Sequence, residues 1–317
     1  MRKPSRSSWW SRREFWCIPD ISLSSRRKGI LSSVSSLPRR SSKRAFGGSF
    51  VEWGESERAW RGVRFDCKGD EAMVEKDEKR EPKDRVILAL DVPTAEAALR
   101  LVEETRGLVG MYKIGSQLFT ATGPDLVRAL LRGGERVFLD LKFHDIPTVV
   151  ARAGVEAARL GVSMFTLHAL GGEPMMRAVV EAVADFCARE GIARPRVLAV
   201  TVLTSLEAKD LAKMGLQAEP EEIAVALARL AHACGVGGVV ASAWEIARIR
   251  EAIPDREFAI IVPGVRPSGT PPHDQRRLAT PQEAIRAGAD YLVLGRPVLE
   301  SDRPREILED ILRQLSS

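Results

Sequence analysis

The 317-residue chain is 44% hydrophobic, which is enough for one large barrel or two smaller domains with a complete core. It has no apolar run near the roughly 20 residues that a membrane-spanning helix needs, which excludes a helical membrane protein. The four cysteines lack paired or metal-ligand spacing, which excludes a disulfide framework and indicates a reducing, cytoplasmic compartment.

The net charge of +5 is unevenly distributed. Residues 1–83 hold 20 of the 48 basic and 12 of the 43 acidic residues, which leaves 28 and 31 for residues 84–317. We expect residues 1–83 to be a disordered Ser- and Arg-rich extension. It is a transit-type peptide, a basic arm for nucleic acid or anionic lipid, or a segment outside the natural protein, which then starts at Met73. We favour the third interpretation and expect no membrane or nucleic-acid partner.

From residue 84 onward, apolar strand-like runs alternate with amphipathic helix-like segments. Strands are predicted at residues 86–91, 110–115, 136–141, 163–168, 196–203, 237–241, 258–262 and 291–294. Helices are predicted at residues 93–106, 124–131, 146–160, 174–189, 206–214, 220–234, 243–252, 281–287 and 303–315. This α/β alternation favours a closed (β/α)8 TIM barrel over residues 84–317. A doubly wound sheet is the alternative, but the glycine fingerprint it needs is missing after the first strand.

The chain places most of its polar strand-end residues where a TIM barrel has its active site, at the carboxyl ends of the strands. Any one of them is more simply a cap or a surface charge, and only the joint pattern favours a site. The residues are Asp91, Lys113, Asp140, Lys142, His168, Thr204, Gly264, Arg266, Gly295 and Arg296.

The third strand ends in an unusual group of charges. Asp140 and Lys142 lie on one face of the strand, and Asp145 follows in the turn before the next helix. A structural ion pair explains one Asp–Lys pair, but a third charge makes that explanation weaker. With Lys113, these residues can form an alternating network that holds an ammonium group for proton transfer or anion stabilisation. A carboxylate pair can also bind Mg²⁺, although no Cys/His cluster marks a metal site.

The last two strand ends predict an anion site. Gly264 and Gly295 permit close backbone approach, and Arg266 and Arg296 can each present a guanidinium fork to phosphate. Gln275, in the long loop after the seventh strand, can close over a ligand.

The run Asp-Leu-Lys-Phe-His-Asp-Ile-Pro at residues 140–147 resembles the signature of the orotidine 5′-phosphate decarboxylase family. Segments at residues 88–91, 112–115, 201–205, 263–267, 274–277 and 294–297 resemble that family in the same order. The resemblance covers residues 84–317. It implies a homodimeric carboxy-lyase that converts orotidine 5′-monophosphate to UMP, the last step of pyrimidine biosynthesis, without cofactor or metal.

The resemblance also implies roles for individual residues. Lys142 protonates C6 as CO2 leaves, Asp140 faces the substrate carboxylate, and Lys113 links the network to the ribose. Asp145 reaches the site of the neighbouring subunit. The substrate-binding residues it implies are Asp91 and Lys113 at the ribose, Asp140, Ile146 and Thr148, Thr204 at the pyrimidine, and Arg266, Gln275, Gly295 and Arg296 at the phosphate.

One position departs from the family pattern. The family usually has Asn-Thr after Asp-Ile-Pro, whereas this chain has Thr148 and Val149. Val149 lacks the hydroxyl that helps to contact the ribose, and Thr148 is turned from that position by about 100° on a helix.

Two alternatives remain open from the sequence. One is a related Mg²⁺-dependent barrel that acts on a sugar phosphate, such as a keto-gulonate-phosphate decarboxylase or hexulose-phosphate synthase. The other is a non-catalytic nucleotide-binding barrel whose basic arm lies on nucleic acid.

Overall fold

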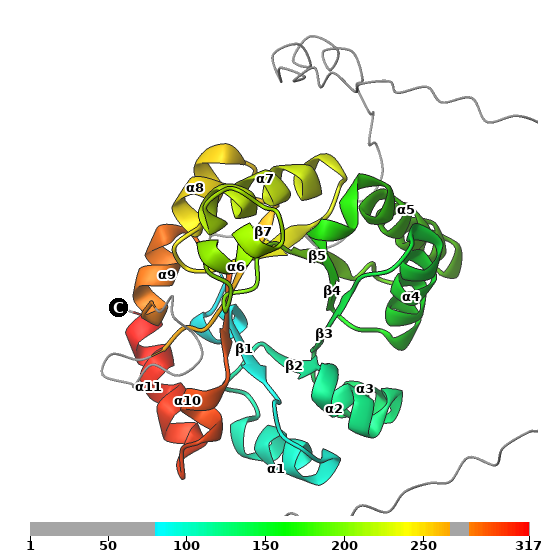
Figure 1. The fold of residues 1–317 in the computed structure, drawn as a ribbon. Coiled ribbons are helices and arrows are strands. Elements are labelled where there is room, and N and C mark those ends of the chain that lie inside the picture. The colour runs from blue at the N-terminus through cyan, green and yellow to red at the C-terminus, as the bar shows by residue number, and fades with distance from the viewer. Residues whose placement is uncertain (1–79, 267–278, 317) are drawn as a thin grey trace, which may run out of the picture. The chain divides into compact units, whose positions relative to one another are not determined.

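The computed structural model describes residues 80–266 and 279–316. Eight parallel strands form a closed barrel, in which each strand pairs with the next and β8 pairs with β1 (Figure 1). The strands are β1 (Val86–Ala89), β2 (Met111–Gly115), β3 (Val137–Phe143), β4 (Met164–His168), β5 (Arg196–Val200), β6 (Gly238–Val240), β7 (Ala259–Pro263) and β8 (Tyr291–Leu294). The predicted (β/α)8 TIM barrel is confirmed.

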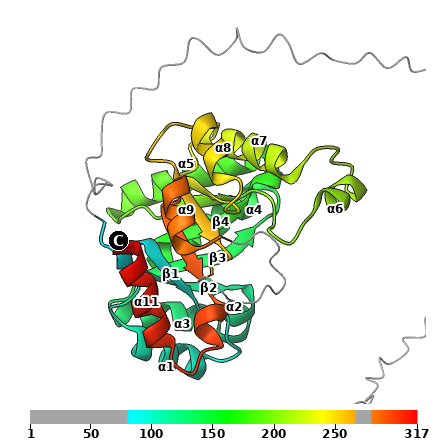
Figure 2. The same ribbon diagram turned by 90° about the vertical axis from the view of Figure 1, so that its left-hand side faces the viewer.

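Helices surround the barrel (Figures 1 and 2). They are α1 (Ala95–Thr105), α2 (Ser116–Thr122), α3 (Pro124–Arg132), α4 (Pro147–Leu160), α5 (Gly172–Glu190), α6 (Ala208–Lys213), α7 (Pro220–Ala233), α8 (Ile246–Ala252), α9 (Pro281–Ala287), α10 (Arg296–Leu299) and α11 (Pro304–Ser316), with the 3-10 helices η3 (Pro82–Arg85) and η4 (Ala169–Gly171). Within the described ranges, no helix is both long enough and apolar enough to span a bilayer.

Helix ends are predicted best where capping residues mark them. Helix α9 has the predicted bounds, because Thr280 and Glu283 form a capping box and Gly288 ends the helix in the left-handed conformation. Helices α2 and α10 were not predicted. Helix α2 buries only Leu118 and has no side-chain cap, and α10 has four residues, so neither leaves a periodic signal.

Strand β5 is shorter than the predicted 196–203. It pairs with β4 up to His168 opposite Val200, and with β6 up to Val240 opposite Val200. Both neighbours therefore end at the same level, and a strand needs a neighbour to continue. The amide of Thr201 still donates to Val240 O, and residues 202–204 then leave the sheet and line the cavity at the mouth of the barrel before the chain reaches α6 (Figure 2).

The barrel interior changes from apolar to polar along its axis. Side chains alternate along each strand, so every second residue points inward. An apolar cluster fills the interior and consists of Ile87, Ala89, Met111, Phe138, Met164, Leu198, Ala259, Ile261, Tyr291 and Val293. Two residues further along β2, β3 and β4, the inward positions belong to Lys113, Asp140 and Thr166, which are buried. The apolar cluster thus fills the barrel below a layer of polar residues at the carboxyl ends of the strands.

At the opposite end of the barrel, Asp290 joins β7, β8 and α8. Its Oδ2 accepts hydrogen bonds from Ile260 N at 2.6 Å and from Arg250 Nη2 at 2.5 Å. Arg250 also donates to the carbonyl oxygens of Gly288 and Phe258. Both charged side chains are nearly inaccessible to solvent, at 12% and 7% exposure, so each neutralises the other in a poorly solvated place.

We predict that Asp290→Ala lowers the free energy of unfolding by about 3–5 kcal/mol, because the guanidinium of Arg250 and Ile260 N–H stay buried without this acceptor. Urea unfolding measures the loss. Asp125→Ala is the matched control, since it breaks an exposed ion pair with Arg128 and is expected to cost less than about 1 kcal/mol. Equal losses in the two variants would contradict the prediction.

Candidate active site

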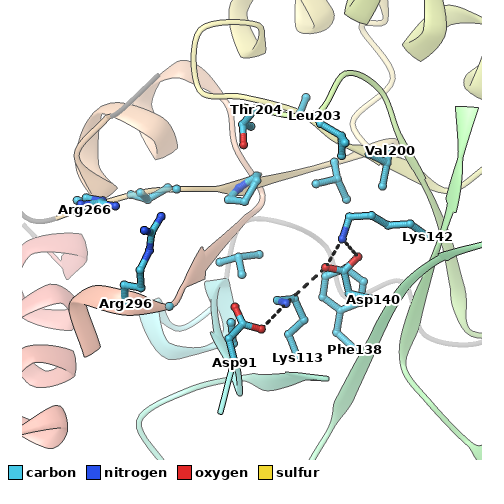
Figure 3. A pocket seen from close by; sticks show the side chains of 18 of the residues that line it. Asp91, Lys113, Phe138, Asp140, Lys142, Val200, Leu203, Thr204, Arg266 and Arg296 are labelled. Carbon is cyan, nitrogen blue, oxygen red and sulfur yellow. Dashed lines mark hydrogen bonds and ion pairs between the residues drawn. The ribbon is translucent and has the colours of Figure 1, made fainter. Parts of the chain in front are cut away.

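A cavity of about 280 Å³ opens at the carboxyl ends of the strands (Figure 3). Seven of the eight strands, or the turns that follow them, contribute to its wall. Its lining residues are Ala89, Asp91, Lys113, Phe138, Asp140, Lys142, Val200, Val202, Leu203, Thr204, Val240, Ala241, Pro263, Gly264, Val265, Arg266, Val293, Gly295, Arg296 and Pro297. Its four cationic and two anionic side chains give the lining a net positive charge, which suits an anionic ligand.

Four charged side chains form a chain of alternating sign along one side of the cavity (Figure 3). Lys113 Nζ lies 3.2 Å from Asp91 Oδ1 and 3.5 Å from Asp140 Oδ2. Lys142 Nζ donates to both carboxylate oxygens of Asp140 at 2.9 Å. Asp140 is therefore held between two ammonium groups, and the Lys142 ammonium has a fixed position at the cavity wall.

The ionisation of Asp140 is set by opposing effects. Burial disfavours the charged carboxylate, but the charges of Lys113 and Lys142 and hydrogen bonds from Lys142 and Thr166 outweigh it and lower the pKa of Asp140 below its usual value. Asp140 thus stays ionised although its side chain is only 12% exposed. A permanent negative charge here keeps both lysines in place.

The pairing of β3 with β4 is irregular at this point. Leu139 pairs with Phe165, and the next pair is Phe143 with Leu167. Asp140, Leu141 and Lys142 therefore stand opposite one residue of β4. Such a bulge re-aims side chains, and here it brings two charged side chains of one strand to the cavity.

The other side of the cavity carries Arg266 and Arg296 (Figure 3). Arg266 is 5% exposed, which argues against a solvated surface charge. Gly264 has a φ of 77°, a conformation that glycine adopts most easily. With Gly295, these residues lie together as the sequence predicted. Gln275, the remaining residue expected at this end, lies outside the described residues.

The turn after β3 lies away from this cavity. Asp145, Ile146 and Thr148 are exposed and do not line it, and Asp145 Oδ1 accepts a hydrogen bond from Ile146 N at 2.6 Å. The network expected for Lys113, Asp140, Lys142 and Asp145 therefore forms with Asp91 in the place of Asp145. Asp145 follows the bulge and is exposed to solvent.

The apolar wall of the cavity and one buried polar residue beside it were not predicted from the sequence. Phe138, Val200, Val240 and Val293 line the cavity, and Thr166 lies behind it with no exposed surface. The two-residue alternation of side chains along a strand could have identified Thr166, because it puts Thr166 on the face of β4 that also carries Met164 and His168.

His168, another predicted strand-end residue, packs beside the network. Its ring stacks on that of His144, with centroids 5.3 Å apart, and its Nδ1 accepts a hydrogen bond from Leu170 N at 3.3 Å. Burial and the nearby His144 and Lys142 lower the pKa of His168 to about 4. The imidazole is therefore neutral near pH 7 and adds no positive charge next to Lys142.

The fold and the cavity define a (β/α)8 barrel with a charged, enzyme-like site at the carboxyl ends of its strands. The chain belongs to the orotidine 5′-phosphate decarboxylase / HUMPS family, whose model matches residues 84–311. This confirms the family that the motifs resemble.

Similar proteins cover the same part of the chain. Proteins named orotidine 5′-phosphate decarboxylase from Syntrophotalea carbinolica and Geobacter sulfurreducens are 47% and 49% identical to it over 237 and 235 residues. These matches cover 75% and 74% of this chain and 97% and 96% of the relatives. The crystal structure of orotidine 5′-phosphate decarboxylase from Lactobacillus acidophilus superimposes with a TM-score of 0.65 at 31% identity, over 73% of this chain and 99% of that one.

We predict that His168 makes the protein less stable on acidification. Its pKa is about 4 in the folded protein, against about 6.5 when unfolded, so the unfolded state binds more protons between these values. The free energy of unfolding should fall as the pH drops from about 6.5 to 4. In His168→Asn, whose side-chain oxygen can still accept from Leu170 N, this fall should be smaller. Urea unfolding at several pH values measures the difference, and an unchanged slope would contradict it.

Proposed function

We propose that the protein decarboxylates orotidine 5′-monophosphate to UMP, with Lys142 as the proton donor to C6 and without a cofactor. One observation carries the proposal: an ammonium group bound to both oxygens of Asp140 lies across the cavity from two arginines. The names of the relatives support the reaction.

The two sides of the cavity suit the two ends of this substrate. We assign the phosphate to Arg266 and Arg296, with the backbone at Gly264 and Gly295 close enough to approach it. Lys113 and Asp91 are assigned to the ribose. Thr204, which Figure 3 shows on the far side of the cavity from Asp91, is assigned to the pyrimidine.

The chemistry needs stabilisation of negative charge at a carbon. Cleavage of the bond between C6 and the carboxylate releases CO2 and leaves its electron pair at C6. The Lys142 ammonium, held by Asp140, can stabilise this carbanion and then transfer a proton to it. Because the charges are in place before the reaction, little reorganisation is needed during it. Lys113 holds Asp140 from the other side, so Asp140 stays in position as Lys142 loses its proton.

We also propose a homodimer in which Asp145 completes the site of the neighbouring subunit. Asp145 is exposed, and beside it Ile146 and Val149 are 62% and 45% exposed. Leu170 in η4 is 50% exposed, and the adjacent Gly171 lies against His144, since a Cβ there would be 3.4 Å from its ring. Exposed aliphatic side chains around a carboxylate support an interface at this turn. Ile146 and Thr148 would then contact substrate across that interface.

The remaining assignments concern the chain as a whole. We assign the catalytic unit to residues 84–317, which the family match at residues 84–311 supports. We place the reaction in the cytoplasm, because Cys187 and Cys234 are free and buried. Among the residues described, no group of three or more His, Cys, Asp or Glu side chains is arranged to hold a metal ion.

We predict that Lys142→Ala lowers kcat for orotidine 5′-monophosphate by at least about 10³-fold, because both the proton donor and the fixed positive charge are lost. The loss of substrate absorbance, measured with a chelator present, follows the reaction, and circular dichroism checks the fold. Lys209→Ala, which removes an exposed lysine, is the control and should keep full activity.

Three results would contradict this function. Turnover retained in Lys142→Ala would remove the assigned role of Lys142. Activity abolished by the chelator would favour the Mg²⁺-dependent sugar-phosphate barrel. UMP binding without turnover in the wild-type protein would favour a non-catalytic nucleotide-binding barrel.

A mixing experiment tests the shared site. Lys142→Ala and Asp145→Ala should each be nearly inactive, but dimers reassembled from an equal mixture should regain about a quarter of wild-type activity. Half of those dimers contain one subunit of each kind, and each has one site with both residues intact. Mixing either variant with the double variant Lys142→Ala/Asp145→Ala is the control and should restore nothing. No recovery in the first mixture would show that Asp145 serves its own subunit or none.

A further inference from the structure

We propose that Thr166 is a positioning residue, which sets the place of the Lys142 ammonium and the Asp140 carboxylate by bridging the bulge in β3. This inference rests on the proposed function, because it assigns Thr166 a share in the reaction of that site. Thr166 has no exposed surface and does not line the cavity, so it acts through its two neighbours and not on the substrate.

The position of Thr166 follows from the irregular pairing of β3 with β4. Between the pairs Leu139–Phe165 and Phe143–Leu167, Thr166 is the single residue of β4 opposite three residues of β3. A regular pair of strands would satisfy the backbone here with its ladder of hydrogen bonds, which a bulge interrupts. A side chain of β4 must therefore supply the hydrogen-bond acceptor that the backbone of a regular strand would offer to the amide of β3.

The Thr166 hydroxyl makes a hydrogen bond at each end of the bulge. Lys142 N donates to Thr166 Oγ1 at 2.8 Å, and the hydroxyl donates to Asp140 Oδ1 at 2.9 Å. A hydroxyl has one proton to donate, so accepting from the amide leaves that proton for the carboxylate. The bridge thus ties the backbone of Lys142 to the side chain of Asp140, and Asp140 in turn holds Lys142 Nζ.

The backbone of Lys142 requires such support. Its φ is 52°, and within the described ranges it is the one non-glycine residue with a positive φ. Residues with a side chain disfavour this left-handed conformation and keep it where the surroundings hold them. The bond from Lys142 N to Thr166 is the contact that holds this amide. Without it, the bulge can relax and the ammonium moves from the position that Asp140 and the backbone together define.

A purely structural role for Thr166 makes a different prediction. If its hydroxyl only satisfies buried groups, its removal lowers stability and leaves the turnover of the folded protein unchanged. If it positions Lys142 and Asp140, turnover falls while substrate binding persists, because Arg266 and Arg296 lie on the other side of the cavity.

Three variants separate these roles. Thr166→Val keeps the shape of the side chain but loses the hydroxyl, and Thr166→Ser keeps the hydroxyl. Thr105→Val is the matched control: Thr105 is also fully buried, and its hydroxyl donates to Leu101 O at 2.7 Å in α1. If Thr166→Val does not fold, Thr166→Cys replaces it, since a thiol is a weaker hydrogen-bonding group of similar size.

We expect Thr166→Val to lower kcat for orotidine 5′-monophosphate by about 10- to 100-fold, as for the loss of a hydrogen bond to a charged group. KM should change by less than about threefold, because phosphate binding is unaffected. Thr166→Ser should recover most of the turnover, and Thr105→Val should keep it while losing stability. A crystal structure of Thr166→Val should show Lys142 with another φ or its ammonium away from Asp140.

Each opposite result overturns the inference. Wild-type kcat in Thr166→Val, no recovery in Thr166→Ser, or an equal loss in Thr105→Val would each show that the hydroxyl has no positioning role. A wild-type protein inactive on orotidine 5′-monophosphate would refute the proposed function alone. The crystal structure then still decides the positioning, because an unchanged bulge in Thr166→Val would refute it without any activity measurement.

Discussion

The site depends on the hydrogen bonds and ion pairs of the Asp140 carboxylate. It receives hydrogen bonds from the Lys142 ammonium and the Thr166 hydroxyl, and the Lys113 ammonium lies within 3.5 Å. A buried carboxylate is costly without such partners, and the buried Lys113 ammonium is costly without the carboxylates of Asp140 and Asp91. The charged groups therefore stabilise one another, and removing Asp140 leaves two ammonium groups close together at the end of the apolar interior.

The barrel provides the place for this group. Its apolar interior, from Ile87 to Val293, forms a rigid floor, and short strands bring the polar residues to one level above it. The loops then supply what the strands cannot: Thr204 from the segment after β5, and Arg266 and Arg296 after β7 and β8. At the other end, the buried pair of Arg250 and Asp290 joins α8 to the last two strands. Stability and chemistry are thus placed at opposite ends of the same strands.

Most of the fold could be predicted from the sequence, because alternating periodicity and capping residues are local signals. The charged residues could be predicted as a group from their strand-end positions, and Asp91, Lys113, Asp140 and Lys142 do meet in one cavity. The bulge could not be predicted, because it depends on the register between β3 and β4, and register is a property of two strands. For that reason the bridging position of Thr166 could not be predicted either. Helix α2 was missed because its burial is confined to one leucine.

The bulge in β3 also constrains how this strand can change in length. It adds two residues relative to β4, an even number, so the alternation of side chains continues in phase beyond it. Lys142 therefore still faces the cavity, while Leu141 and Phe143 still pack on the outer core, where Phe143 lies 6.0 Å from the ring of Phe165. A further change by two residues would keep that order without any new irregularity in the pairing. A change by one residue keeps the lysine at the cavity only where the bulge itself takes up the difference, as a bulge of two residues opposite one does. The length of this strand is therefore coupled to the form of the bulge between Leu139 and Phe143.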